Sequence, residues 1–141
     1  MKNVEITSTP ISKFLDETNK RINLLVGGAG SGKSWAVALH ILRLAYSQKD
    51  KSILVTRKTL PSLRITAYKL ILDLLKKYDL PYELNKSEMV ITTPTGSQIL
   101  FKSLDEPEKI KSAEFNYIWV EECTEITIDD FRQLNLRLRR K

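Results

Sequence analysis

The sequence predicts an α/β fold in which a mainly parallel sheet is flanked by helices. Three short apolar runs, at 22–26, 53–56 and 117–120, do not alternate with polar residues, which is typical of strands buried on both faces. Segments with helical periodicity follow the first and the second run. This order of strand, helix, strand and helix favours a parallel sheet with helices on both sides.

The first half of the chain divides into four elements. Residues 1–20 are polar and irregular, apart from a short amphipathic piece around 11–15. Residues 22–26 are expected to form a buried strand that ends at glycines. The segment 35–47 is apolar nearly all round and is therefore expected to be a buried helix. Residues 53–56 are expected to form the second buried strand.

The second half begins with a helix from Pro61 to about Tyr78, because Pro suits a first helical turn and apolar residues recur on one face. Residues 89–93 and 98–102 flank a Pro-Thr-Gly-Ser turn and predict a β-hairpin. The last segment, 129–141, fits either a helix or a strand. Two aspartates at its start suit a first helical turn, so we expect a helix.

Composition limits the class of protein. At 141 residues, with 42% hydrophobic and 28% charged residues, the chain is expected to be one soluble globular domain. Its apolar runs are too short to span a membrane, and no secretory signal is recognisable, so a cytoplasmic protein is expected. With one cysteine and one histidine, Cys123 and His40, neither an internal disulfide nor a zinc site is expected.

The net charge of +6 is unevenly distributed. Residues 1–70 contain 12 Lys and Arg against 4 Asp and Glu, whereas residues 71–141 contain 11 against 13. A basic first half suits a polyanionic partner, either a nucleotide or a nucleic acid. A solvated basic face would give the same count, so charge alone does not decide.

A phosphate-binding motif follows the first predicted strand. The stretch Gly-Gly-Ala-Gly-Ser-Gly-Lys-Ser matches the pattern G-x-x-x-x-G-K-[ST], and the predicted helix begins beside it. The glycines let backbone N–H groups point at an oxyanion, and the helix directs its positive end there. Lys33 can reach the β and γ phosphates, and the Ser34 hydroxyl can bind Mg²⁺. The expected nucleotide-binding residues are Gly27, Gly28, Ala29, Gly30, Ser31, Gly32, Lys33, Ser34 and Trp35.

Two adjacent carboxylates follow the third apolar run. Glu121 and Glu122 come directly after residues 117–120, at the end of a parallel strand, where ligands bind in open α/β sheets. We expect Glu121 to hold the Mg²⁺ shell together with Ser34, and Glu122 to polarise the water that attacks the γ-phosphate. Asp is usual at the first position, and a water-mediated metal contact can absorb the extra methylene of Glu121. The alternative is a solvated strand end with surface salt bridges.

These motifs resemble those of one family, the large subunit of phage terminase of the PBSX type. The likeness is carried by GGAGSGKSW at 27–35, ILVTRKT at 53–59, FKSLDEPEKIKS at 101–112 and IWVEECTEIT at 118–127. The first motif occurs in many NTPases, whereas the last two are much more specific in this order and spacing. The resemblance covers the chain from about Arg21 to its end.

The resemblance implies a P-loop ATPase of the ASCE type that uses ATP and Mg²⁺ to drive double-stranded DNA into a viral capsid. Such proteins act as a homo-oligomeric ring around the portal protein, together with a small terminase subunit. The same positions imply that Lys33 and Ser34 bind phosphate and Mg²⁺, that Glu121 is the residue on the metal side, and that Glu122 is the catalytic glutamate.

Two departures from the family pattern are visible. Many relatives have Arg in the loop where this chain has Ala29, so the cation that stabilises the transition state is unassigned; Arg57 is one candidate, and Lys109 or Lys111 acting on a neighbouring subunit is another. Family members also continue into a further strand and a nuclease domain. Residues 1–141 are therefore expected to be the N-terminal part of the ATPase domain, without nuclease activity.

Two other functions stay open at this point. A small nucleoside kinase would share the phosphate loop but needs an Arg-rich lid and an acceptor pocket, which assays with nucleoside acceptors would reveal. A non-catalytic prophage remnant would keep the fold without turnover, and its DNA binding would be unaffected by replacement of Lys33.

Overall fold

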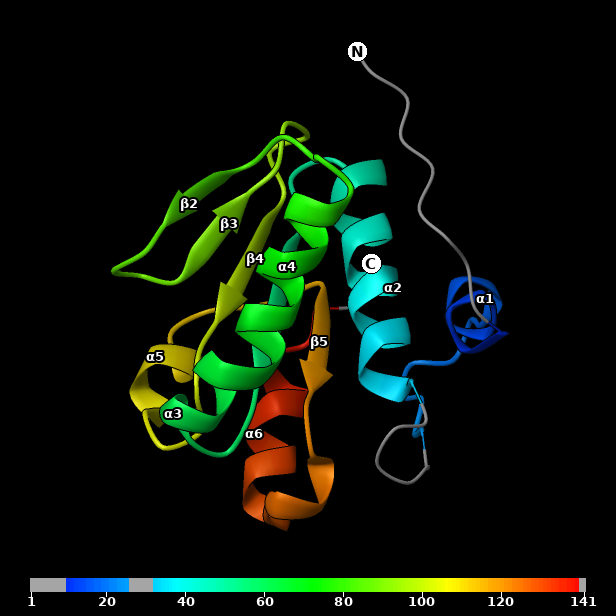
Figure 1. The fold of residues 1–141 in the computed structure, drawn as a ribbon. Coiled ribbons are helices and arrows are strands. Elements are labelled where there is room, and N and C mark those ends of the chain that lie inside the picture. Colours follow the sequence, from blue (N-terminus) through cyan, green and yellow to red (C-terminus); the bar gives the residue numbers. More distant parts are fainter. Residues whose placement is uncertain (1–9, 26–31, 140–141) are drawn as a thin grey trace.

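A five-stranded sheet in the order β2-β3-β4-β1-β5 forms the middle of the molecule (Figure 1). The structure, a computed structural model, describes residues 10–25 and 32–139. The strands are β1 (Ser52–Thr56), β2 (Glu83–Asn85), β3 (Val90–Thr92), β4 (Gln98–Phe101) and β5 (Tyr117–Val120).

The sheet is mixed, and its parallel part, β4-β1-β5, forms one side of it. β1 pairs in parallel with β4 and with β5, so that Leu54 lies opposite Leu100 on one side and Ile118 on the other. β2, β3 and β4 pair antiparallel, which confirms the predicted hairpin between β3 and β4 and adds β2, a strand that the sequence did not indicate. The predicted α/β fold with helices around the sheet is confirmed.

Helices cover both faces of the sheet (Figure 1). The segment predicted as one helix from Pro61 to Tyr78 is helical throughout but contains a π turn, labelled η1, between two α-helical parts. Among the residues described, no helix is both long and apolar enough to cross a bilayer. The helical elements are α1 (Pro10–Glu17), α2 (Lys33–Ser47), α3 (Leu60–Leu63), η1 (Arg64–Tyr68), α4 (Lys69–Lys77), α5 (Pro107–Lys111), η2 (Cys123–Glu125) and α6 (Ile128–Arg137).

Alternate residues of β1 build two separate cores. Ile53 and Val55 are fully buried in the larger core, which α2 and α4 cover. Leu54, between them, is fully buried in the smaller core on the other face, together with Ile110 of α5 and Leu134 of α6. Since neighbouring strand residues point to opposite faces, the unalternating apolar run is explained by burial on both sides.

A tight turn joins β3 to β4 and requires glycine. Gly96 has φ = 84°, and a Cβ at this position would lie 2.3 Å from Asp50 Oδ1. The turn is closed by the backbone N–H of Thr93, which donates to Ser97 O at 2.9 Å. Gly96 therefore serves both the left-handed backbone and the close approach of Asp50.

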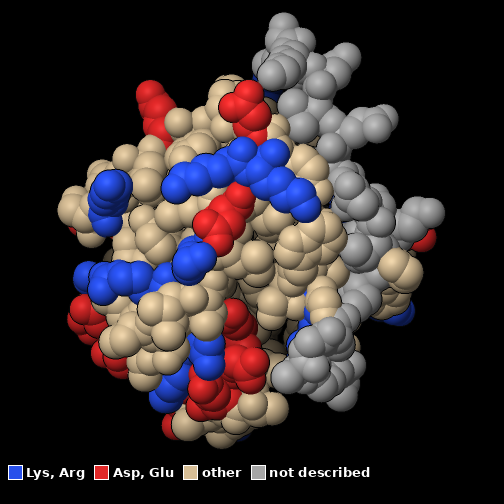
Figure 2. Space-filling view, in the orientation of Figure 1, with Lys and Arg blue, Asp and Glu red and all other residues tan. Residues whose placement is uncertain are grey.

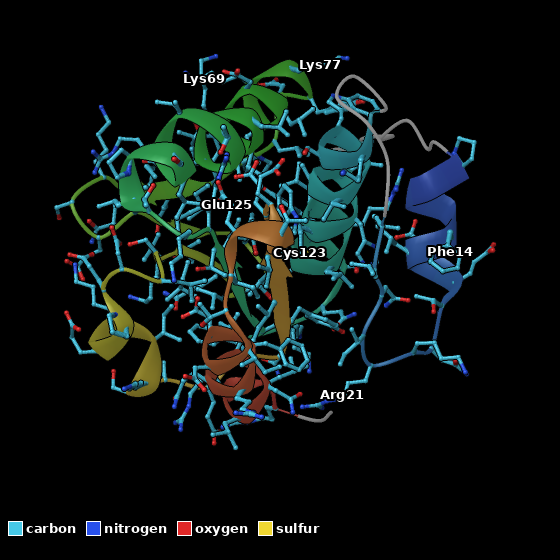
Figure 3. All side chains as sticks on the ribbon, turned by 90° about the horizontal axis from the view of Figure 1, so that it is seen from below. Phe14, Arg21, Lys69, Lys77, Cys123 and Glu125 are labelled. Carbon is cyan, nitrogen blue, oxygen red and sulfur yellow. The ribbon has the colours of Figure 1, made fainter. Side chains whose placement is uncertain are left out.

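The predicted buried strand at 22–26 is wrong over residues 22–25, and Val26 lies outside the described residues. Ile22 and Leu24 are 57% and 71% exposed, and residues 22–25 pair with no strand among those described. An apolar run forms a buried strand only where it can pair with the edge strand of a sheet. Here Arg21 instead donates to Asn135 O and Leu138 O at the end of α6 (Figure 3). These hydrogen bonds hold the start of the segment against α6.

Candidate functional site

The N-terminus of α2 and the carboxyl end of β5 lie at the same end of the molecule, the lower end in Figure 1. β1 runs parallel to β5 and therefore ends there too. Crevices outside the carboxyl ends of parallel strands are where open α/β sheets bind ligands. The fold thus gathers the end of the glycine-rich motif, the acidic pair and Arg57 on one side.

The glycine-rich motif is described only at its end. Gly27, Gly28, Ala29, Gly30 and Ser31 lie outside the described residues.

Gly32 precedes α2 with φ = 78° in the left-handed region, and a Cβ there would meet nothing within 4 Å, so the backbone angle rather than space favours glycine. Lys33 and Ser34 form the first turn of α2 and are partly buried. The first N–H groups of a helix have no partner within it, so this end of α2 is suited to an anion.

Trp35 is partly buried and packs against the larger core. Lys77, at the end of α4, places its Nζ 5.4 Å from the centre of the Trp35 ring. This contact is a cation–π interaction. Trp35 therefore links the first turn of α2 to the end of α4. Its contact with a nucleotide stays a prediction.

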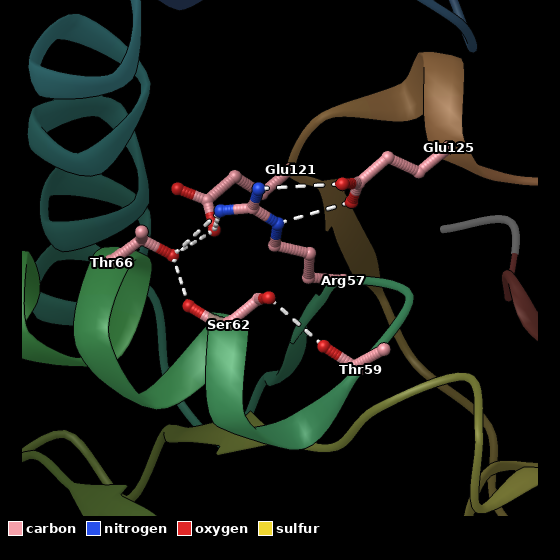
Figure 4. Close-up of polar contacts among 6 residues, drawn as sticks. All are labelled: Arg57, Thr59, Ser62, Thr66, Glu121 and Glu125. Carbon is pink, nitrogen blue, oxygen red and sulfur yellow. Dashed lines mark hydrogen bonds and ion pairs between the residues drawn. The ribbon is translucent and has the colours of Figure 1, made fainter.

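Glu121 is a buried carboxylate at the end of β5. Its side chain is 7% exposed, and its backbone N–H donates to Thr56 O at 2.8 Å, which continues the pairing of β5 with β1. The Thr66 hydroxyl lies 2.5 Å from Glu121 Oε1, and Arg57 Nη1 lies 3.6 Å from the same oxygen (Figure 4).

The Thr66 hydroxyl faces two acceptors. It lies 2.6 Å from Ser62 O and 2.5 Å from Glu121 Oε1, and it shares its one proton between them. Burial raises the pKa of Glu121, against the opposing effects of the Thr66 hydrogen bond and the Arg57 charge. Glu121 is therefore easier to protonate than an exposed glutamate.

Arg57 joins this carboxyl to a second one. Its Nε and Nη2 donate to Glu125 at 3.1 and 3.4 Å, and its Nη1 donates to Thr66 Oγ1 at 3.2 Å. Figure 3 shows Glu125 on the loop that follows β5. The hydrogen bond to Glu125 raises the pKa of Arg57, which therefore stays charged. In this structure the guanidinium is engaged by protein carboxylates, and its predicted role as a transition-state cation stays untested.

Glu122 differs from its neighbour in exposure and in backbone conformation. It is exposed, and its backbone is left-handed, at φ = 53° and ψ = 59°. Few residues other than glycine adopt this region, and such strained positions cluster at functional sites. The strained turn presents Glu122 to solvent while Glu121 stays buried.

The two lysines considered as alternative cations lie elsewhere. α5, which carries Lys109 and Lys111, packs on the face of the sheet opposite α2 (Figure 1). Both side chains are exposed, and Lys109 Nζ forms an ion pair with Glu106 at 3.3 Å. Within this chain the fold does not bring these lysines to the acidic pair.

Sequence reasoning missed Thr66 and Glu125. Thr66 lies in a segment that any helical pattern includes, and only the π turn directs it towards the end of β5. A weak signal is the β-branched pair Ile65-Thr66, since such residues crowd an α-helix. Glu125 lies in a single 3-10 turn after β5, and its spacing from Arg57 gives no signal.

Large terminases are among the solved structures that resemble this chain. The large terminase ATPase domain of Thermus phage P74-26 matches with a TM-score of 0.74 and 13% identity, over 93% of this chain and 61% of that one. A large terminase from a thermophilic bacteriophage, in complex with ADP, matches with a TM-score of 0.66 and 17% identity, over 79% of this chain and 29% of that one. At these identities the matches establish the fold, that of terminase ATPase domains.

The sequence comparison decides the family. The model of the family described as phage terminase large subunit matches residues 19–141. The chain belongs to the phage terminase large-subunit family. Within it, the PBSX phage terminase large subunit of Bacillus subtilis (strain 168) is 34% identical over 118 residues, which are 82% of this chain and 27% of that protein. The chain therefore spans about a quarter of the length of this relative, and the resemblance found in the sequence is confirmed.

Proposed function

We propose that this chain is the ATP-binding and ATP-hydrolysing motor domain of a phage terminase large subunit, and that it powers the packaging of double-stranded DNA into a capsid. The observation that carries the proposal is that the N-terminus of α2, which begins with Lys33 and Ser34, lies at the same end of the molecule as the buried Glu121. A terminase with the same fold binds ADP, which supports nucleotide binding here. Residues 1–141 then represent the N-terminal part of the ATPase domain.

The described residues fit a magnesium nucleotide. A serine hydroxyl and a carboxylate are the oxygen ligands that Mg²⁺ prefers, and Ser34 and Glu121 supply them. The Thr56 hydroxyl, at the end of β1, is fully buried and has no hydrogen-bond partner among the described residues. A buried polar group without a protein partner at this point supports the presence of a ligand or its water shell. Among residues 10–25 and 32–139, no group of three His, Cys, Asp or Glu could hold a metal by itself, so the phosphates would complete the site.

Each residue then has a distinct task. When bound, Mg²⁺ neutralises charge on the β and γ phosphates. Lys33 and the first N–H groups of α2 bind the phosphates and fix their position. Glu121 faces the metal as a carboxylate, and Thr66 and Arg57 keep its carboxyl oriented. Glu122, exposed and adjacent, accepts the proton of the attacking water.

The family also supplies the proposed partners. We propose double-stranded DNA as the translocated substrate, and the portal protein and a small terminase subunit as protein partners. A homo-oligomeric ring in the cytoplasm of the bacterial host is the assembly in which the motor would act.

Nucleotide binding tests the first part of the proposal. Lys33→Ala should weaken the binding of MgATP at least tenfold in calorimetric titration, because the phosphates lose their cationic partner. Lys49→Ala, an exposed lysine outside the site, is the matched control and should leave the affinity unchanged. Equal affinities for all three proteins would refute the assignment of the loop.

Turnover tests the second part. Glu122→Gln should leave MgATP affinity intact and reduce phosphate release at least 100-fold, since the base is lost while the shape is kept. Glu88→Gln, also exposed, controls for the loss of one negative charge. Normal turnover of Glu122→Gln would show that another group activates the water.

A further inference from the structure

A groove of about 500 Å³ lies away from the nucleotide site, between the helical segment from η1 to α4 and the β2–β3 hairpin. Its helical wall is a stripe of residues at four-residue intervals, which places them on one side of the helix. This stripe consists of Arg64, Tyr68, Leu72 and Lys76.

The opposite wall is a stripe along β2 and its continuation. Residues at two-residue intervals point to one face of a strand, and here they are Tyr82, Leu84 and Lys86. Glu83 lies between two of them and so belongs to the other face. Met89, which is buried, closes the groove.

The two walls share one pattern, in which apolar residues lie between cations. Tyr68, Leu72, Tyr82 and Leu84 are partly buried and form the centre, whereas Arg64, Lys76 and Lys86 are exposed at the ends. Figure 2 shows several Lys and Arg side chains on this face of the molecule, with Asp and Glu side chains among them. An apolar centre with a charged rim is the arrangement of a protein-binding surface, and Tyr, Met and Arg are enriched in such surfaces.

The cations at the ends are not neutralised from within. Among the described residues, Arg64, Lys76 and Lys86 have no carboxylate within ion-pair distance, and Arg64 Nη2 contacts only Met89 Sδ, at 3.8 Å. Other cations on the surface do have such partners, for example Lys69 with Asp73 at 2.9 Å. An anionic partner would therefore find these three charges available.

The groove is also held in shape without a ligand. The Tyr68 ring packs edge-on against Phe101, with 5.0 Å between ring centres. Tyr46 of α2 donates to Pro81 O at 2.8 Å and so fixes the start of β2. Because both walls are anchored, little ordering has to accompany binding.

We propose that this groove binds an extended, acidic segment of a partner protein, with large apolar side chains at its centre and carboxylates at both ends. Helical geometry places Arg64 and Lys76 ~18 Å apart along the axis, which an extended segment of about five or six residues spans. A DNA duplex, stiff over ~150 base pairs, could contact the cations but could not place its surface on the apolar centre of the groove. The inference does not depend on the nucleotide chemistry proposed above.

Fluorescence anisotropy with a labelled peptide tests this proposal. The probe has paired glutamates at both ends and Leu-Phe at its centre, and it should bind the wild-type chain saturably. Lys86→Glu should weaken binding at least fivefold, because attraction at the rim becomes repulsion. Lys49→Glu changes the net charge equally at an exposed site outside the groove and should change the affinity less than twofold.

Changes in the peptide separate the groove from a generally basic surface. Replacing Leu-Phe by Ser-Ser should weaken binding at least tenfold, since the apolar centre loses its partner. Equal binding of the Ser-Ser peptide, equal effects of the two lysine variants, or displacement of the peptide by single-stranded or duplex DNA at lower concentration than by unlabelled peptide would overturn the proposal. Peptide binding by Lys33→Ala should be unchanged, which keeps this test apart from that of the nucleotide site.

Discussion

The two faces of the π turn at Arg64–Tyr68 treat charge in opposite ways. On the inner face, Thr66 contacts both Glu121 and Arg57. These two opposite charges lie 3.6 Å apart, and both side chains are largely shielded from water. On the outer face, Arg64 lies at the end of an open groove and pairs with no carboxylate among the described residues. One helical turn thus has two roles: through Thr66 it positions the buried carboxyl of Glu121, and through Arg64 it presents a cation to the groove.

The largest expected effect comes from removing the inner cation. Arg57→Met should reduce the free energy of unfolding by about 2–3 kcal/mol at pH 8, because it leaves two carboxylates without their partner, one of them buried. Loss of the cation raises the pKa of Glu121 further, so the destabilisation should shrink as pH falls and Glu121 becomes protonated. Urea denaturation at pH 8 and pH 5 measures both quantities.

Arg64→Met is the matched control for that experiment. It removes the same side chain from the outer face and should change the free energy of unfolding by less than about 0.5 kcal/mol, since Arg64 is exposed. Equal losses for the two variants would mean that the two faces do not differ as the contacts indicate.

A smaller effect, of opposite sign, should follow from neutralising the buried carboxyl. Glu121→Gln should stabilise the fold by roughly 1 kcal/mol at pH 8, or about 4 °C in Tm, because burial disfavours the charged carboxylate and the amide carries no charge. Since the pKa of Glu121 is raised, its ionisation costs stability as pH rises, and the gain should vanish below about pH 4. A thermal melt series from pH 4 to pH 8 would contradict this if the variant were less stable throughout.

The smallest effect concerns Asp130, an acid in the opposite situation. Burial alone would raise the pKa of Asp130, but the hydrogen bonds from Lys58 and from the Thr127 backbone outweigh it and lower the pKa. Asp130→Asn should therefore cost about 0.5–1 kcal/mol above its ordinary pKa of 3.8, through loss of the ion pair at 2.7 Å with Lys58.

For Asp130 the loss should disappear as pH falls through the lowered pKa, because wild type then loses the same interaction. Acid titrations of stability in the two variants thus run in opposite directions. Parallel curves for Glu121→Gln and Asp130→Asn would show that the two environments do not differ.

Much of the fold was predictable because burial leaves a pattern in the sequence. The apolar runs at 53–56 and 117–120 are β1 and β5, and the Pro-Thr-Gly-Ser turn joins β3 to β4. The ambiguous segment after Asp129 is helical to Arg137. The capping box of Thr127 and Asp130, at the start of α6, favours the helix. The strand predicted at residues 22–25 was wrong because an apolar run indicates only a preference for burial. Strand pairing also requires a free sheet edge, which other parts of the chain provide.

The candidate site was predictable to the extent that it rests on short motifs. Ser34 and Glu121 follow from a loop and a strand end, and the fold brings both to one side. Thr66 and Glu125 could not be predicted, because their contacts with Arg57 depend on a π turn and on a single turn after β5. Neither turn produces a periodic pattern of apolar residues in the sequence.

The π turn also has a consequence for how the chain tolerates insertion and deletion. A π turn closes with about one residue more than an α turn, so it absorbs a surplus residue while the flanking helices α3 and α4 stay nearly in phase. Deleting one residue between Arg64 and Tyr68 should therefore restore a uniform α-helix without turning α3 relative to α4. The wider turn that carries Thr66 to Glu121 would be lost, however. A single surplus residue thus shapes the surroundings of Glu121 and leaves the helices on either side in place.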